Sequence, residues 1–175
     1  MYLKYFKYVM QHKINVFKCC INKAKIKIKN KEYDTAAMLF THAFTHDLSK
    51  FRPSEFVPYA RWFYGKYGVN FEIGEYPTLS DGLAAVKNRQ YDRDQFDAAW
   101  EKHYKRNKHH WNYWENKYMP YKYILQMICD WEAMGMKFGN SAKEYYIKNC
   151  DKIKLHSQSK LIIEWELGLC DCEVW

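Results

Sequence analysis

The chain contains no uncharged apolar run of about 18 residues, the minimum for a membrane-spanning helix, and its mean hydropathy is −0.64. Both features argue against a membrane protein. The opening residues Met1 to Lys4 also lack the apolar stretch of a signal peptide. We therefore expect a cytoplasmic protein with no membrane partner.

The six cysteines include no Cys-x-x-Cys pair. Cys19 and Cys20 are adjacent, and Cys170 and Cys172 are separated by one residue, which is too close for easy disulfide formation within either pair. The sequence predicts reduced thiols and argues against a zinc ribbon.

No acidic residue precedes Glu32, whereas nine lysines do. The net charge is +8, so the basicity lies in residues 1–31 and the rest of the chain carries −1. This basic segment could attract the phosphates of a nucleotide or nucleic acid, or an acidic surface. A solvated helix face that aids solubility explains the lysines equally well.

The chain has enough apolar residues for a core, since 48% of its 175 residues are hydrophobic and 19% are aromatic. Apolar side chains recur at spacings of three and four, and no βαβ alternation is present. Helices are expected over 3–21 and 35–48, from Asp94 past Asn107, from Pro120 to near Gly135, and after the caps Ser141 and Ser157. The sequence predicts an all-α fold, an irregular helical bundle that forms a single domain over residues 1–175.

Residues 52–90 contain three of the four prolines and four of the seven glycines. Both residue types interrupt regular structure. We expect an irregular insertion here, which could supply a lid or a substrate pocket.

Donor side chains gather in the second predicted helix. His42, His46 and Lys50 are four residues apart and share one face if the helix continues that far, with Asp47 beside His46. Imidazole nitrogens and carboxylate oxygens suit Mn, Fe, Co, Ni or Zn. A neighbouring histidine and aspartate also arise by chance, as a cap or a surface pair.

A second cluster contains His103, His109 and His110. In an unbroken helix, His103, Asn107 and His110 would share one face, and we expect one of His109 and His110 to be a ligand while the other contacts substrate or supports a ligand.

Two further candidates lie on apolar helices. Asp130 lies among apolar residues such as Ile128 and Trp131, and burial of its carboxylate would require a partner, which could be a metal or a basic side chain. His12 is embedded in the apolar face of the first predicted helix, where an ordinary core histidine is the alternative.

The order His12, His46-Asp47, His103, His109-His110, Asp130 resembles that of the HD-domain metal-dependent phosphohydrolase superfamily. That superfamily shows a helix-borne histidine, a His-Asp pair often followed by lysine, and a late aspartate. Three local sequences, residues 46–51, 107–114 and 119–131, also resemble an uncharacterised group of phage and bacterial proteins. No Gly-Tyr-Pro sequence accompanies the histidines, so nothing specific points to cleavage of cyclic dinucleotides.

The resemblance implies a two-metal site in an HD-like fold. One divalent ion (Mn, Fe, Co, Ni, Zn or Mg) would be held by His12, His46, Asp47 and Asp130. Asp47 would bridge to a second ion, completed by His103 with His109 or His110. His42 competes with His12 as the first ligand. Water between the ions would attack a phosphoester, with Asp47 and Lys50 as the catalytic residues.

Cations and aromatic residues near the metal candidates suggest a nucleotide as substrate. Candidate substrate contacts are Lys50, Arg52, Lys108 and Trp111. Lys50 could instead interact with a helix dipole, and aromatic residues at such spacing are more often core. Two other functions stay open: an HD-like di-iron oxygenase, and a non-enzymatic phage factor that binds nucleic acid through the basic segment.

Overall fold

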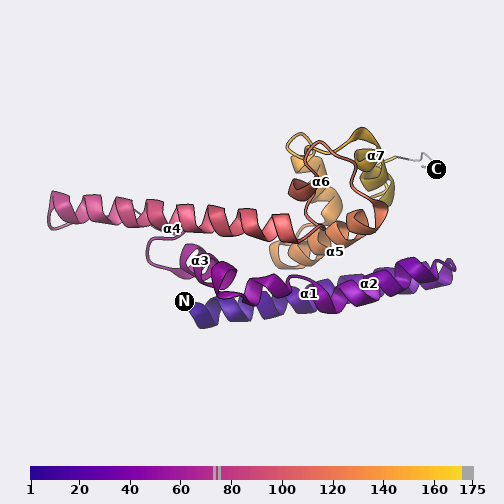
Figure 1. The fold of residues 1–175 in the computed structure, drawn as a ribbon, viewed down its shortest axis with the longest axis horizontal. Coiled ribbons are helices and arrows are strands. Elements are labelled where there is room, and N and C mark those ends of the chain that lie inside the picture. Colours follow the sequence, from indigo (N-terminus) through magenta and orange to yellow (C-terminus); the bar gives the residue numbers. More distant parts are fainter. Residues whose placement is uncertain (73, 75, 171–175) are drawn as a thin grey trace. The chain divides into compact units, whose positions relative to one another are not determined.

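The computed structural model describes residues 1–72, 74 and 76–170, and this part of the chain contains helices and no strand (Figure 1). The predicted all-α class is confirmed. The elements are α1 (Tyr2–Lys29), α2 (Tyr33–Thr45), the 3-10 helix η1 (Leu48–Phe51), α3 (Pro53–Tyr64), α4 (Leu79–Arg106), the 3-10 helix η2 (Trp111–Trp114), α5 (Tyr121–Phe138), α6 (Ala142–Asn149) and α7 (Ser157–Glu166). No helix in the described ranges is long and apolar enough to cross a membrane. The five described cysteines are free thiols, and Cys172 lies outside the described residues.

The chain divides into two compact units, each of which is described by itself. The first unit contains Met1–Met10 and Leu48–His103. Its core joins the start of α1 to α3 and α4 through Tyr5, Val9, Tyr59, Ala60 and Ala99. Aromatic rings dominate this core, and the rings of Tyr5 and Tyr59 stack with centroids 6.0 Å apart.

The second unit contains Gln11–Asp47 and the chain from Tyr104 on. Within it, α2 runs antiparallel beside α1 (Figure 1), and both pack on α5 through small buried side chains such as Cys20, Ala43 and Cys129. The other side of α5 packs on α6 and α7 through Ile128 and Ile163, among others. Because helices cover two sides of α5, this helix is buried along most of its length. The single domain over residues 1–175 stays a prediction.

The expectation of irregular structure over residues 52–90 is wrong for most of that stretch. Helix α3 begins at Pro53, where a missing N–H leaves no helical hydrogen bond unmade. Helix α4 begins at Leu79 and not near Asp94, and Thr78 caps it, since its Oγ1 accepts a hydrogen bond from the Asp81 amide at 3.1 Å. The role of this region as a lid stays a prediction.

Two predicted helix ends are also corrected. Helix α2 ends at Thr45, so His42, His46 and Lys50 do not lie on one continuous helix. Helix α4 ends at Arg106, and the chain then turns, with the amide of His110 donating to the carbonyl oxygen of Asn107 at 3.1 Å. The shared helical face proposed for His103, Asn107 and His110 therefore does not form.

The caps after residue 138 agree with the sequence in part. Ser141 caps α6 in a reciprocal pair with Glu144, as predicted. Ser157 is the first residue of α7 rather than its cap, and the imidazole of His156 accepts from the Gln158 amide instead. Helix α5 continues past Gly135 and stops at Gly139, whose φ of +75° is the left-handed conformation typical of a helix end.

Candidate metal centre

A tight turn at the end of α2 positions His46 and Asp47. Asp47 has φ +53°, a left-handed conformation that aspartate tolerates better than most residues. The Nζ atom of Lys13 on α1 donates to the carbonyl oxygens of Phe44 at 3.3 Å and of His46 at 2.6 Å. Lys13 thereby satisfies carbonyls that the end of a helix leaves unpaired, and it holds this turn in place.

Four buried side chains converge beside this turn, and we call them the carboxylate cluster: His12, His46, Asp47 and Asp130. His12 Nε2 lies 3.1 Å from His46 Nε2 and 3.1 Å from Asp130 Oδ1. His46 Nε2 lies 3.3 Å from Asp47 Oδ2 and 3.5 Å from Asp130 Oδ1. Helices α1 and α5 thus bring His12 and Asp130 to the end of α2. His12 and His46 are therefore the partners that the buried Asp130 carboxylate requires.

Charge in the carboxylate cluster shifts two pKa values strongly. Burial opposes the charged form of His46, but Asp47 and hydrogen bonds with Asp130 outweigh burial and raise the pKa of His46 from 6.5 to about 9. Burial of Asp130 favours its neutral form, yet hydrogen bonds with His12 and His46 hold the pKa of this carboxyl well below 3.8. The cluster therefore combines a positively charged imidazolium with carboxylates. A divalent cation could take the place of that positive charge.

The donor chemistry of the carboxylate cluster fits a divalent metal. One ligand atom each from His12, His46 and Asp47 lies within 4.8 Å of the others, and Asp130 adds a second carboxylate. Two imidazoles with two carboxylates suit borderline divalent ions. The structure thus brings together all four residues expected for the first ion.

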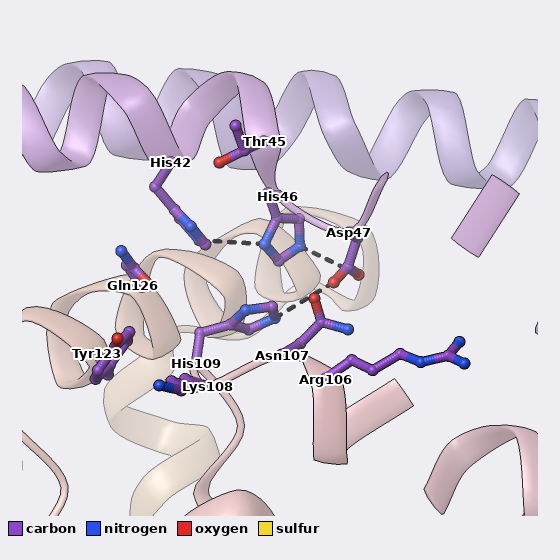
Figure 2. Close-up of a pocket in the computed structure, with 10 residues that line it drawn as sticks. All are labelled: His42, Thr45, His46, Asp47, Arg106, Asn107, Lys108, His109, Tyr123 and Gln126. Atoms are coloured by element: carbon purple, nitrogen blue, oxygen red, sulfur yellow. Dashed lines mark hydrogen bonds and ion pairs between the residues drawn. The ribbon is translucent and has the colours of Figure 1, made fainter. Parts of the chain in front are cut away.

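Two more buried histidines lie on the other side of His46. Figure 2 shows His42 and His109 facing it, with His42 Nε2 at 3.2 Å from His46 Nδ1. His109 Nε2 lies 3.3 Å from Asp47 Oδ1. Burial, then the charge of His46, then His109, lower the pKa of His42 to about 3. Burial and the charge of His46 also lower the pKa of His109, so both rings are neutral at pH 7.

A cavity of about 350 Å³ opens beside these histidines (Figure 2). Its wall is formed by His42, Thr45, His46, Asp47, Arg106, Asn107, Lys108, His109, Tyr123 and Gln126. The predicted substrate residue Lys108 is therefore at the cavity, and Arg106 adds a second cation that the sequence did not suggest. His110 is half-buried with its ring against His109, at a centroid distance of 4.2 Å. Of His109 and His110, it is His109 that is buried and forms part of the cavity wall.

The remaining metal candidate, His103, lies in the first unit and is fully buried. Its Nδ1 is 2.9 Å from Oε2 of Glu55, which is also fully buried and accepts from Ser49 Oγ at 2.8 Å. Because a carboxylate accepts the Nδ1 hydrogen, Nε2 is the nitrogen of His103 suited to ligate a metal. The grouping of His103 with residues of the second unit stays a prediction.

Three further sequence candidates have different surroundings. Lys50 is half-buried in η1, and Arg52 is exposed where α3 begins. Trp111 packs against the apolar cluster of α5, α6 and α7, which is the core role usual for aromatic residues. The substrate contacts of all three stay predictions.

Besides Lys13, two lysines of the basic segment have structural partners in the second unit. Lys27 is buried, and its Nζ lies 2.6 Å from Tyr121 Oη and 3.0 Å from Glu32 Oε2. Lys23 pairs with Glu166 at 2.7 Å. These contacts account for two of the nine lysines without a nucleic acid.

The sequence did not suggest the roles of Lys13 and Glu55. Lys13 is one of many lysines in the basic segment, and Glu55 lies in a proline-rich stretch, where an acid is usually exposed. The spacing of four residues does predict His42 beside His46, and the two rings lie side by side although α2 ends at Thr45.

One family model matches residues 1–168 of the chain. The chain belongs to the family of unknown function DUF5662. No curated protein and no solved structure matches it. The buried histidines and aspartates of this DUF5662 protein are therefore interpreted from their own geometry.

Proposed function

We propose that this DUF5662 protein is a metal-dependent phosphohydrolase that acts on a nucleotide or another phosphoester. The observation that carries the proposal is the convergence of two imidazoles and two carboxylates in the buried carboxylate cluster, next to a cavity with cationic side chains. Burial of such a donor set is costly unless the charges are paired, and a divalent ion pairs them. The order of these residues along the chain also resembles the HD-domain superfamily.

A bound divalent ion would supply activation of water and neutralisation of phosphate charge near neutral pH. The ligands of the first ion would be His12, His46, Asp47 and Asp130. Asp47 is suited to serve two ions, because Oδ2 lies 3.3 Å from His46 Nε2 while Oδ1 lies 3.3 Å from His109 Nε2. This division of its two oxygens supports a two-metal site.

The chain's own side chains supply the substrate environment. Arg106 and Lys108 precede His109 in sequence and form part of the cavity wall, where they would bind phosphate oxygens. The Nζ atom of Lys108 also lies 5.9 Å from the centre of the Tyr123 ring. The cavity could therefore hold an anionic group against an aromatic ring.

The test is hydrolysis by purified protein loaded with Mn or Co, on a panel of nucleoside mono- and triphosphates and linear and cyclic dinucleotides. We expect turnover of at least one phosphoester, and its loss in Asp47→Ala. Asp34→Ala is the control, because Asp34 is an exposed carboxylate on α2, the helix that precedes Asp47. No turnover of any phosphoester by the metal-loaded protein would contradict the proposal.

A further inference from the structure

We infer a second metal site in the second unit, made by the imidazoles of His42, His46 and His109, which shares only His46 with the carboxylate cluster. We call it the three-histidine site. The ion that three imidazoles favour is a transition metal such as zinc or copper. The inference goes beyond the proposed hydrolysis and does not depend on it, because occupancy can be measured without any substrate.

The three rings surround a common point. Ring centroids are 5.0 Å apart for His42 and His46, 4.6 Å for His46 and His109, and 5.3 Å for His42 and His109. One ligand nitrogen of each ring lies within 4.8 Å of the others, and all three residues are buried. Three imidazoles with nitrogens this close are positioned to bind one small cation.

The two ring nitrogens of His46 face different groups of residues. Nε2 lies among His12, Asp47 and Asp130, whereas Nδ1 lies 3.2 Å from His42 Nε2. A ligand to Nδ1 therefore does not displace the neighbours of Nε2. When both sites are filled, His46 would coordinate one ion through each nitrogen, and its ring protons would be released to solvent.

The three-histidine site opens onto a cavity. Figure 2 shows His42, His46 and His109 on the cavity wall with Tyr123 and Gln126. Three protein ligands beside a cavity leave a coordination position for water or an anion, an arrangement typical of catalytic rather than structural zinc. The site is therefore suited to an exchangeable fourth ligand.

The two sites should differ in metal preference. The carboxylate cluster offers hard oxygen ligands that suit Mn, whereas three imidazoles without a carboxylate favour Zn, Ni or Cu. The rival role for His42 is to accept a hydrogen bond from His46 Nδ1 and so orient a ligand of the first ion, as partners of metal-binding histidines commonly do. The two roles predict different zinc stoichiometries.

The experiment isolates the three-histidine site in the full chain by disabling the carboxylate cluster with Asp130→Asn. Zinc bound after equilibrium dialysis is measured by mass spectrometry in Asp130→Asn and in the double variant Asp130→Asn with His42→Leu. At saturating zinc we expect about one bound equivalent in the first, and loss of that equivalent in the second because a ligand has been removed. Thr41→Ala in place of His42→Leu is the control, since Thr41 is exposed on the same helix.

Equal zinc binding by the Asp130→Asn protein and its His42→Leu derivative would overturn the inference and leave His42 its orienting role. If the double variant does not fold, the Cu(II) electron paramagnetic resonance spectrum of Asp130→Asn decides. Nitrogen coupling from three imidazoles supports the three-histidine site, and coupling from fewer overturns it. Failure of the proposed hydrolysis would appear separately, as zinc bound by an inactive protein.

Discussion

The Nε2 atoms of His12 and His46 lie 3.1 Å apart, although His12 is on α1 and His46 follows the end of α2, 34 positions later in the sequence. Asp130 Oδ1 lies within 3.5 Å of both nitrogens. Two imidazole nitrogens at this distance must share a proton or a cation, because two unprotonated lone pairs would repel each other. This contact therefore lies at the centre of the carboxylate cluster.

Asp130→Asn should weaken metal binding by at least about tenfold, because the variant keeps the side-chain shape but removes one anionic ligand. Isothermal titration with Mn on metal-free protein measures the effect. The matched control is Asp151→Asn, which changes an exposed aspartate of the same unit. Equal Mn affinity in wild type and Asp130→Asn would show that Asp130 is only a structural partner of His12.

The metal-free protein should be most stable near pH 6.5. The raised pKa of His46, about 9, stabilises the fold fully below 6.5, and this contribution is lost as pH rises from 6.5 to 9. The lowered pKa of His42, about 3, acts in the opposite direction, so its contribution is lost as pH falls from 6.5 to 3. Urea unfolding in the presence of a chelator, followed by circular dichroism from pH 4 to 9.5, measures both changes.

His42→Leu should flatten the acid side of this profile and leave the alkaline side. Asp130→Asn should flatten the alkaline side, since it removes a group that raises the pKa of His46. Stability of the metal-free wild type that rises steadily from pH 6.5 to 9 would contradict the charge state described for His46.

Lys13→Met should destabilise the protein by about 1–3 kcal/mol, the usual range for hydrogen bonds to a charged donor. The variant removes the donor to the carbonyl oxygens of Phe44 and His46 but keeps the apolar stem. It should also weaken metal binding, because the turn at Asp47 loses its support. Lys18→Met, at an exposed position of α1, is the control for lost charge. If the two variants unfold at the same urea concentration, Lys13 does not hold the turn.

Glu55→Ala should destabilise the protein by about 1–3 kcal/mol, because it removes the acceptor of the buried His103 Nδ1 and of the half-buried Ser49 Oγ. The neighbouring Ser54→Ala, at an exposed position of α3, should cost much less. Chemical unfolding compares them directly. A Glu55→Ala protein as stable as Ser54→Ala would mean that the buried pair with His103 contributes no net stability.

The amphipathic helices were predictable from sequence because their apolar residues recur on one face, and α5 is the clearest case. The beginning of α4 was not predictable in this way. Between Leu79 and Gln90 only Ala85 is buried, so this part of the helix lacks an apolar stripe. Prolines and glycines nearby then suggested a loop.

The site was predictable in its residue types and less so in its geometry. The order of His12, His46, Asp47 and Asp130 indicated one cluster, and the need of a buried Asp130 for a partner followed from the cost of an unpaired charge. The end of α2 depends on a contact with Lys13 from another helix, which no local pattern reveals. The closeness of His42 and His46, by contrast, follows from their spacing of four residues, one helical turn.

Metal content of the protein as isolated tests most directly whether the buried histidines and aspartates hold metal. Mass spectrometry measures it in wild type, in Asp47→Ala and in the exposed control Asp34→Ala. We expect about one equivalent or more of a divalent transition metal in wild type and Asp34→Ala, and a clear loss in Asp47→Ala. A metal-free wild type that takes up no metal on dialysis, or an Asp47→Ala protein with unchanged content, would contradict this expectation.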